Sequence, residues 1–250
     1  MLEGGNRTQR QKSGNPIVSV ITVTRNAADC LETAIQSVLS QSFPDVEHII
    51  LDGASTDGTI EILKKYNDQI AYWKSEADGG VYDAMNKAVQ YAQGKWVLFL
   101  GADDELFDGF SEMAERHLKR PDHIYYGCSL WKNLVFGCQY SGYMLAKENI
   151  THQSIFYPRS IFDSYKFLLK YKVRADYVMN MQLWADKHYR FEYVRLLISR
   201  YAAGGFSGQV IDEAFRKDRV HLVGKYLGFF VKLRYILKRY KYKRINFVEY

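Results

Sequence analysis

Apolar residues recur along residues 16–105 with two alternating periods, one typical of strands and one typical of helices. Apolar or alternating runs at 17–23, 46–51, 70–74 and 96–100 predict strands, and the last is apolar throughout, as in a strand buried on both faces. Helical spacing of apolar residues predicts helices at 31–39, 60–66 and 81–92. This alternation predicts an α/β fold with right-handed crossovers and a mostly parallel, Rossmann-like sheet that carries helices on both faces.

The rest of the chain has a less regular pattern. We expect a helix at 110–118, short strands at 124–129 and 155–157, a helix from about Asp176 and a strand near 193–198. The chain is therefore divided into a disordered leader (1–15), a first half (16–105), a second half (106–210) with a smaller subdomain attached to the sheet, and a basic amphipathic helical tail (211–250). The leader is polar and glycine-rich and lacks the apolar core of a signal peptide.

The net charge of +6 is unevenly distributed. Residues 216–244 contain eleven Lys or Arg and one acid, Asp218, whereas residues 16–215 contain 20 basic and 25 acidic side chains. The basicity therefore belongs to the tail. Three cysteines without C-x-x-C spacing argue against a disulfide framework, and no segment reaches the ~20 apolar residues of a membrane-spanning helix. We expect a cytoplasmic protein that works in solution or at the inner face of the membrane.

Acidic side chains stand where two of the predicted strands end. Asp103 and Asp104 follow the strand 96–100, and Asp52 follows the strand 46–51. The carboxyl ends of parallel strands form the edge at which open α/β sheets bind ligands. Because adjacent carboxylates repel each other, the pair predicts a divalent metal that carries a phosphorylated substrate. The alternatives are a solvated turn for the pair and an Asx-turn for Asp52.

Four strings follow one another through the first half: VSVITVTRN (18–26), LDGASTDGT (51–59), DGGVYDAMNK (78–87) and LGADD (100–104). In this order and spacing they resemble the family-2 glycosyltransferases of the GT-A fold, and the likeness extends over about residues 16–205. The resemblance implies transfer of a sugar from a nucleotide donor, usually with inversion and with a divalent metal, Mg²⁺ or Mn²⁺. It assigns the nucleotide sugar to the first half, and the acceptor and catalysis to the second.

The resemblance also implies roles for single residues. Asp103 and Asp104 match the DxD-like metal pair, with Asp104 as the direct ligand and Asp103 nearer the donor ribose or sugar. Many members carry a second acid in the 51–59 motif that helps to bind uracil, and here that position is Gly53. UDP is still the expected nucleotide. The other donor-binding residues implied are Thr22, Arg25 and Asp52 on the nucleotide wall and Asn86 on the helix lining the pocket.

The catalytic base is expected in the second half. Asp176, in the segment Arg174-Ala-Asp-Tyr177, resembles the position where the family keeps its base. His152 and Gln153 match a recurrent H-Q element of the family, which lines the acceptor or donor-sugar site. Without the resemblance, an Asp near the start of a helix is more readily explained as an N-cap.

An apolar stripe runs through the basic tail from Leu222 to Tyr240, as expected for one amphipathic helix. In one interpretation the segment 222–244 lies on an anionic membrane surface; in the other, its stripe packs on the catalytic domain or on a partner. Both stay open. No stacking platform or RNA-binding motif accompanies the charge, so nucleic acid is not expected as a partner.

The sequence thus predicts a metal-dependent inverting glycosyltransferase of hexosyltransferase type. It would move a sugar from a UDP-linked donor to a hydroxyl of a glycan or lipid-linked acceptor in cell-envelope polysaccharide synthesis. One alternative is a nucleotidyltransferase, although the expected Gly-rich, Lys-containing phosphate loop is missing from the sequence. The other is a non-catalytic sugar-nucleotide-binding or scaffold protein that acts through its basic tail.

Overall fold

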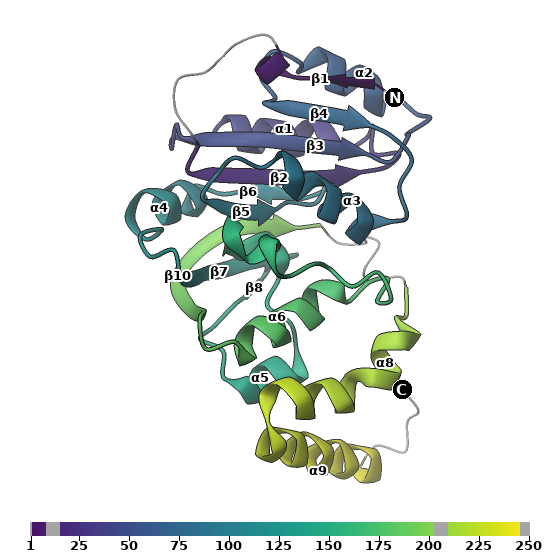
Figure 1. Cartoon of the computed structure of the whole chain (residues 1–250), viewed down its shortest axis with the longest axis vertical. Coiled ribbons are helices and arrows are strands. Elements are labelled where there is room, and N and C mark those ends of the chain that lie inside the picture. Colours follow the sequence, from purple (N-terminus) through teal and green to yellow (C-terminus); the bar gives the residue numbers. More distant parts are fainter. Residues whose placement is uncertain (1, 9–15, 203–209, 246–250) are drawn as a thin grey trace.

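One mixed sheet forms the centre of the molecule. The computed structural model describes residues 2–8, 16–202 and 210–245, with the backbone alone at 241–245. In this part of the chain ten strands have the order β1-β4-β3-β2-β5-β9-β7-β10-β6, and β8 pairs with β7 (Figure 1). The strands are β1 (Leu2–Gly4), β2 (Val18–Thr24), β3 (Val46–Asp52), β4 (Tyr72–Ser75), β5 (Trp96–Phe99), β6 (Glu105–Leu106), β7 (His123–Trp131), β8 (Leu134–Phe136), β9 (Ile155–Pro158) and β10 (Arg190–Tyr201).

The parallel core of the sheet is the predicted one. β2 pairs with β3 and β5 in parallel, and β3 pairs with β4 in the same sense. β9 then runs antiparallel to both β5 and β7, and β7 and β10 are again parallel. The sheet of the first half therefore continues without interruption into the second half.

Helices cover both faces of this sheet, as predicted. Ile21 of β2 packs on the side of α3 and α6, whereas Val18 and Val20 pack on the side of α1 and α4, as the two-residue period of a strand requires. The α-helices are α1 (Leu31–Leu39), α2 (Thr59–Lys65), α3 (Val81–Ala88), α4 (Gly109–Arg116), α5 (Gly142–Lys147), α6 (Ala175–Ala185), α8 (Glu213–Leu222) and α9 (Phe229–Ile245). The 3₁₀ turns are η1 (Asn6–Thr8), η2 (Val89–Tyr91), η3 (His152–Ser154) and η4 (Arg159–Asp163), and η5 (Val223–Leu227) is a π-helix.

The leader differs from the expectation of disorder. Leu2–Gly4 forms β1, which pairs antiparallel with β4 and extends the sheet by one edge strand. The side chain of Arg7 then forms an ion pair with the buried Glu47. Edge pairing supplies hydrogen bonds that the polar, glycine-rich composition does not reveal. Residue 1 and residues 9–15 lie outside the described residues.

The prediction of one tail helix over 222–240 is wrong. Gly228 has φ +94°, a left-handed conformation that ends the first helical segment, and α9 begins at the next residue. The largest hydrophobic cluster of the described residues, called the main core, lies on the side of the sheet that carries α3 and α6. Before this break, the chain packs against the main core through Val223, Tyr226 and Leu227. The described helices include none with the length and apolar character needed to cross a bilayer.

Candidate active site

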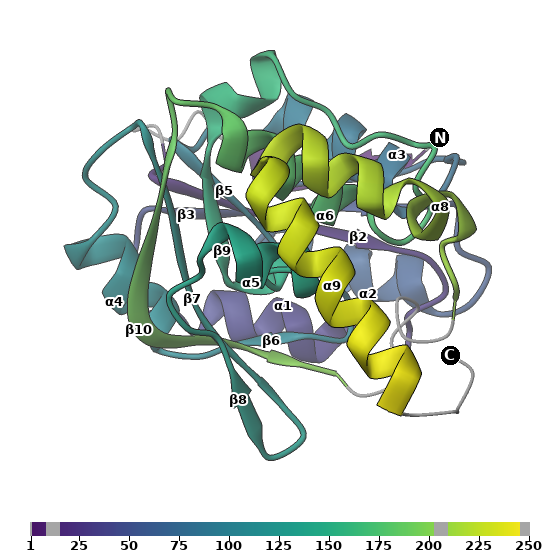
Figure 2. The ribbon, with the colours of Figure 1, turned by 90° about the horizontal axis from the view of Figure 1, so that it is seen from below.

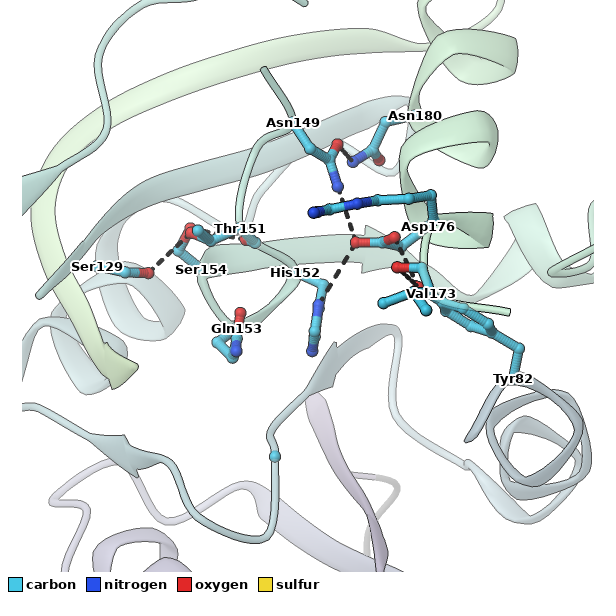
Figure 3. A network of polar contacts seen from close by, with 12 residues as sticks. Tyr82, Ser129, Asn149, Thr151, His152, Gln153, Ser154, Val173, Asp176 and Asn180 are labelled. Atoms are coloured by element: carbon cyan, nitrogen blue, oxygen red, sulfur yellow. Dashed lines mark hydrogen bonds and ion pairs between the residues drawn. The ribbon is translucent and has the colours of Figure 1, made fainter. Parts of the chain in front are cut away.

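The carboxyl ends of β2, β3 and β5 meet at the edge where the acid pair stands. In register, Thr24 is paired with Asp52, and Ile21 with Phe99, so Asp103 and Asp104 follow β5 next to the ends of its neighbours. η3 and the first turn of α6, both from the second half, lie near this edge (Figure 3). The fold therefore brings the predicted metal residues and the predicted base to one region.

Within the acid pair, the two carboxylates have different surroundings. Asp104 is only 2% exposed, and both of its oxygens are hydrogen-bonded. The Ala202 N–H donates to Oδ1 at 2.9 Å, while Gln153 Nε2 and the Gly101 N–H donate to Oδ2 at 2.8 and 3.1 Å. Burial raises the pKa of Asp104, although the hydrogen bond from Ala202 acts against this rise. Asp103 is exposed, so its carboxylate is the more accessible of the two, whereas the carboxylate of Asp104, the expected direct ligand, is already hydrogen-bonded within the protein.

Consecutive residues of η3 connect the two predicted sites. Gln153 is buried and bonds Asp104, so its side chain braces the acid pair and does not line an open pocket. His152, beside it, directs Nδ1 towards Asp176 Oδ2 at 3.5 Å and is one quarter exposed. His152 and Gln153, together called the strap below, therefore link Asp104 at the strand end to Asp176.

Asp176 lies inside the first turn of α6, and Arg174 is the N-cap, so the simple N-cap interpretation is wrong. Asp176 is 7% exposed, and its carboxylate lies between Tyr82, Asn149 and His152 (Figure 3). Tyr82 Oη donates to Oδ1 and Asn149 Nδ2 donates to Oδ2, each at 2.7 Å. These donors come from α3 and from the segment before η3, so two distant parts of the chain fix the carboxylate that α6 carries.

Asp176 and His152 shift each other's pKa. Burial raises the pKa of Asp176, but the hydrogen bond and charge of His152, with hydrogen bonds from Tyr82 and the Tyr177 N–H, together hold the pKa below its ordinary value. Burial likewise lowers the pKa of His152, but the Asp176 carboxylate, with the charges of Asp104 and Asp103, more than offsets this and the net pKa is raised. The aspartate is therefore an anion at neutral pH, as a proton acceptor must be.

Further polar groups hold this network from behind. Asn180 Nδ2 donates to Asn149 Oδ1 at 2.9 Å, and Tyr157 Oη donates to Asn180 Oδ1 at 2.7 Å. Sequence reasoning missed Tyr82 and Asn149. Tyr82 is part of the DGGVYDAMNK string, which was a usable signal, whereas nothing near Asn149 marks it in the sequence.

Three of the predicted donor-binding residues have their polar groups occupied by the protein. Thr22 is fully buried, and its hydroxyl contacts His48 Nε2 at 3.0 Å; burial lowers the pKa of His48 to about 3, so this imidazole is neutral. Asp52 is also buried and accepts hydrogen bonds from Ser55 and Ser75, which fits the Asx-turn alternative. Asn86 forms two hydrogen bonds of 2.9 Å with the Phe167 backbone. The structure therefore does not bring these three side chains to an open donor surface.

A different acid stands beside Gly53. A Cβ atom at Gly53 would lie 2.6 Å from Asp78 Oδ2 and 3.4 Å from Arg25 Cδ, so the Asp78 carboxylate occupies the space that a side chain at position 53 would need. Asp78 is half-buried and Arg25 is exposed, so both are open to a ligand. The Thr24 hydroxyl, at the same strand end, is buried and lacks a hydrogen-bond partner within the described chain.

The donor set fits a metal that arrives with its substrate. The described residues contain no group of three or more His, Cys, Asp or Glu side chains that could hold a metal ion by themselves. Mg²⁺ is commonly bound by one or two carboxylates, with substrate phosphates and water as the remaining ligands. The exposed Asp103 offers one such carboxylate.

A mostly parallel α/β sheet with helices on both faces and an acid pair after a central strand agrees with the GT-A fold that the sequence motifs predict. Residues 19–177 match the sequence model of glycosyl transferase family 2, and the chain belongs to this family. The glycosyltransferase prediction is thereby favoured over the nucleotidyltransferase one.

Relatives and solved structures agree with this assignment. The PGL/p-HBAD biosynthesis glycosyltransferase of Mycobacterium bovis (strain BCG / Pasteur 1173P2) is 33% identical over 215 residues, which are 81% of this chain and 83% of the relative. The putative teichuronic acid biosynthesis glycosyltransferase TuaG of Bacillus subtilis (strain 168) is 36% identical over 152 residues, 49% of this chain and 60% of that protein.

Among solved structures, S. aureus TarS 1–349 in complex with UDP-GlcNAc has a TM-score of 0.63 at 18% identity and covers 84% of this chain and 71% of that chain. The mannosyltransferase PcManGT from Pyrobaculum calidifontis, in complex with GDP-Man and Mn²⁺, has a TM-score of 0.61 at 17% identity and covers 86% and 64%. At such identities the likeness shows the GT-A fold.

Proposed function

We propose that this protein transfers a sugar, with inversion, from a UDP-linked donor to a hydroxyl group of a glycan or lipid-linked acceptor. The observation that carries the proposal is the buried, hydrogen-bonded Asp176 anion, tied through His152 and Gln153 to the acid pair at the end of β5. The strap would hold Asp176, as the proton acceptor, at a fixed distance from the acid pair, which would anchor the donor. Fixed placement of two reactants and a base removes much of the entropic cost of a transfer reaction.

Asp103 is proposed as the protein ligand of the divalent metal, with Asp104 behind it as its brace. Mg²⁺ or Mn²⁺ at this position would offset the negative charge that the diphosphate gains as it leaves. Asp104 fixes the Gly101–Asp104 turn through its hydrogen bonds to Gly101, Gln153 and Ala202. Second-shell contacts of this sort orient the ligand that touches the metal.

Asp176 is proposed as the base. Tyr82 and Asn149 donate hydrogen bonds to this carboxylate, and His152 faces it, so its position and its negative charge are fixed. The carboxylate accepts the proton of the acceptor hydroxyl while that oxygen bonds to the anomeric carbon. The bond from this carbon to the diphosphate breaks on the opposite face, and the leaving oxygen keeps the electron pair.

Many family members carry an acid in the 51–59 motif where this chain has Gly53, and Asp78 is proposed to take the role of that acid. Its carboxylate lies against Gly53 and beside Arg25, at the ends of β2 and β3. It would accept hydrogen bonds from a base N–H or from ribose hydroxyls, and uracil has such an N–H. The unpaired Thr24 hydroxyl supports a polar ligand at the same strand end.

The acceptor is proposed to belong to a cell-envelope glycan, and the reaction to take place in the cytoplasm. The relatives are named for PGL/p-HBAD and teichuronic acid biosynthesis. The three cysteines are free, which fits a reducing compartment. Contact with the membrane is proposed below on separate grounds.

The test combines ligand binding and turnover. Thermal shift with UDP-, GDP- and TDP-sugars, with and without Mn²⁺, should show metal-dependent stabilisation that is largest for one UDP-sugar, because at equal concentration the ligand that binds most tightly stabilises the fold most. Asp103→Asn should lose this stabilisation. Asp176→Asn should keep it but lower kcat by about 10²–10⁴. Asp186→Asn, which changes a half-buried acid outside the site, is the control and should alter neither.

Two outcomes would contradict the proposal. Unchanged turnover in Asp176→Asn would remove this residue from the role of base. A folded protein that binds nucleotide sugars but never transfers or hydrolyses them would favour the non-catalytic alternative.

A further inference from the structure

α9 has one apolar face that the protein covers and a second that it leaves open. Val231 and Tyr235 pack against the main core, where α9 contacts α5 and η5. In the view from below, α9 lies across the outside of the molecule (Figure 2). The opposite side carries five exposed aromatic or aliphatic side chains: Phe229 (69%), Phe230 (82%), Leu233 (44%), Leu237 (60%) and Tyr240 (72%).

These five residues, called the outer stripe, form a continuous band along α9. Positions 230, 233, 237 and 240 follow the three-and-four spacing that places side chains on one face of a helix. Scattered apolar residues on a surface are ordinary, but a contiguous band with two adjacent phenylalanines marks a contact surface. Packing of α9 on its own domain accounts for Val231 and Tyr235 and leaves the outer stripe unexplained.

The positive charges around the outer stripe indicate what kind of partner would cover it. Residues 229–245 contain seven Lys or Arg and no Asp or Glu. At 100° per residue, Lys232 and Arg239 flank the stripe on one side, and Arg234, whose guanidinium lies 3.9 Å from the Tyr143 ring centroid, flanks the other. A second copy of the chain would bring two such basic faces together, which like-charge repulsion opposes. An anionic surface with an apolar interior matches both features.

We propose that the outer stripe of α9 lies flat on an anionic lipid surface. Its aromatic and aliphatic side chains would enter the boundary between headgroups and acyl chains, and the flanking cations would meet the lipid phosphates. α9 packs on α5, in the second half, and lies at the end of the molecule far from β1 and β4 (Figure 1). The lipid surface would thus adjoin the second half, which suits a lipid-linked acceptor; this last step rests on the proposed function, but lipid binding itself does not.

Co-sedimentation of the full chain with vesicles tests the proposal. Phosphatidylcholine vesicles with about 30% phosphatidylglycerol should bind the protein, and pure phosphatidylcholine vesicles should bind it much less. Raising NaCl from about 0.1 M to about 0.5 M should weaken binding, because salt screens surface charge. Lys232→Gln/Arg239→Gln should lower the partition coefficient about 25-fold, at roughly fivefold for each cation.

The apolar contribution has a matched control within the chain. Phe230→Ser/Leu237→Ser should lower partitioning at least tenfold, since two large apolar groups no longer enter the lipid. Leu134→Ser/Val135→Ser changes two residues of β8 that are similarly exposed, at 59% and 61%, and should leave partitioning unchanged. All four positions are at the surface, so circular dichroism should show the same fold for both variants.

Three results would overturn the proposal: no binding of the folded chain to anionic vesicles, an equal loss in the β8 control, or a dimer in light scattering that Phe230→Ser/Leu237→Ser dissolves. The last result would show that a second copy covers the outer stripe. No sugar nucleotide is present in these measurements. Failure of the transfer assay and failure of lipid binding are therefore separate outcomes.

Discussion

The phenol of Tyr82 offers a direct test of how the proposed base is held. Its Oη donates its one proton to Asp176 Oδ1 at 2.7 Å and lies 3.0 Å from the Val173 carbonyl oxygen, and all these groups are buried. Tyr82→Phe removes only this hydroxyl and keeps the ring that packs beside Phe167. The change therefore leaves a buried anion with one hydrogen bond fewer.

The expected loss follows from the charge and burial of the acceptor. A hydrogen bond to a charged group contributes about 1.5–3 kcal/mol, so Tyr82→Phe should lower the free energy of unfolding by about 2 kcal/mol. At about 2–4 °C for each kcal/mol in a chain of this size, Tm should fall by about 4–8 °C. Urea denaturation and calorimetry measure both quantities without any substrate.

Tyr165→Phe is the matched control. Tyr165 Oη also donates to a carboxylate, Asp186 Oδ2, at the same 2.7 Å, but this pair is only partly buried. Because water replaces a lost hydrogen bond at such a position, this variant should lose less than about 1 kcal/mol. Equal losses in the two variants, or no loss in Tyr82→Phe, would refute the argument that burial makes the Asp176 network costly to break.

Three shorter predictions concern the same region. Gly53→Ala should leave the fold intact, because the added methyl group meets only the end of the Asp78 side chain, which can move. Titration calorimetry should show that UDP binds about tenfold more weakly. Unchanged affinity would remove Asp78 from the donor site. Asn86→Ala removes two hydrogen bonds of 2.9 Å to the Phe167 backbone, so the free energy of unfolding should fall by about 2 kcal/mol. Limited proteolysis should then cut faster within residues 163–174. The pKa of His152 is raised and that of Asp176 is lowered, so their contact stabilises the fold fully between about pH 4 and 6.5. This stability is lost above the window as His152 deprotonates and below it as Asp176 protonates. The difference in unfolding free energy between the wild type and His152→Gln should therefore shrink from about pH 5.5 to about pH 8.5, and a growing difference would contradict the pairing.

Elements with a local signal are predictable from this sequence. The run expected as a strand at 17–23 is β2 at 18–24, because its β-branched residues need no distant partner to favour extension. β6, by contrast, has two residues and exists only because Ser199 and Arg200 of β10 pair with it. The tail shows the same limit: its apolar spacing runs on through Gly228, whose left-handed backbone starts a new helix. Periodicity records which residues are apolar, but not where the chain turns.

The acid pair shows why the roles of neighbouring residues cannot be read from the chain alone. Asp103 and Asp104 are chemically identical, and each is a plausible ligand. The difference arises from Gln153 and Ala202, which lie 49 and 98 residues from Asp104 and bury it with hydrogen bonds. Likewise, the space beside Gly53 holds an acid from another loop, because the Asp78 carboxylate fills it.

The strap at η3 explains how two halves of one sheet can hold a single reaction geometry. In a 3₁₀ turn, successive side chains point about 120° apart, so His152 and Gln153 diverge and each bonds a different acid. In the proposed reaction, the separation between the donor anchor and the base is then set by two adjacent residues. Because Ser154 and Thr151 close this turn with their own hydrogen bond, a shift of the turn would displace both acids together. Under that proposal, donor binding and proton acceptance are coupled through His152 and Gln153.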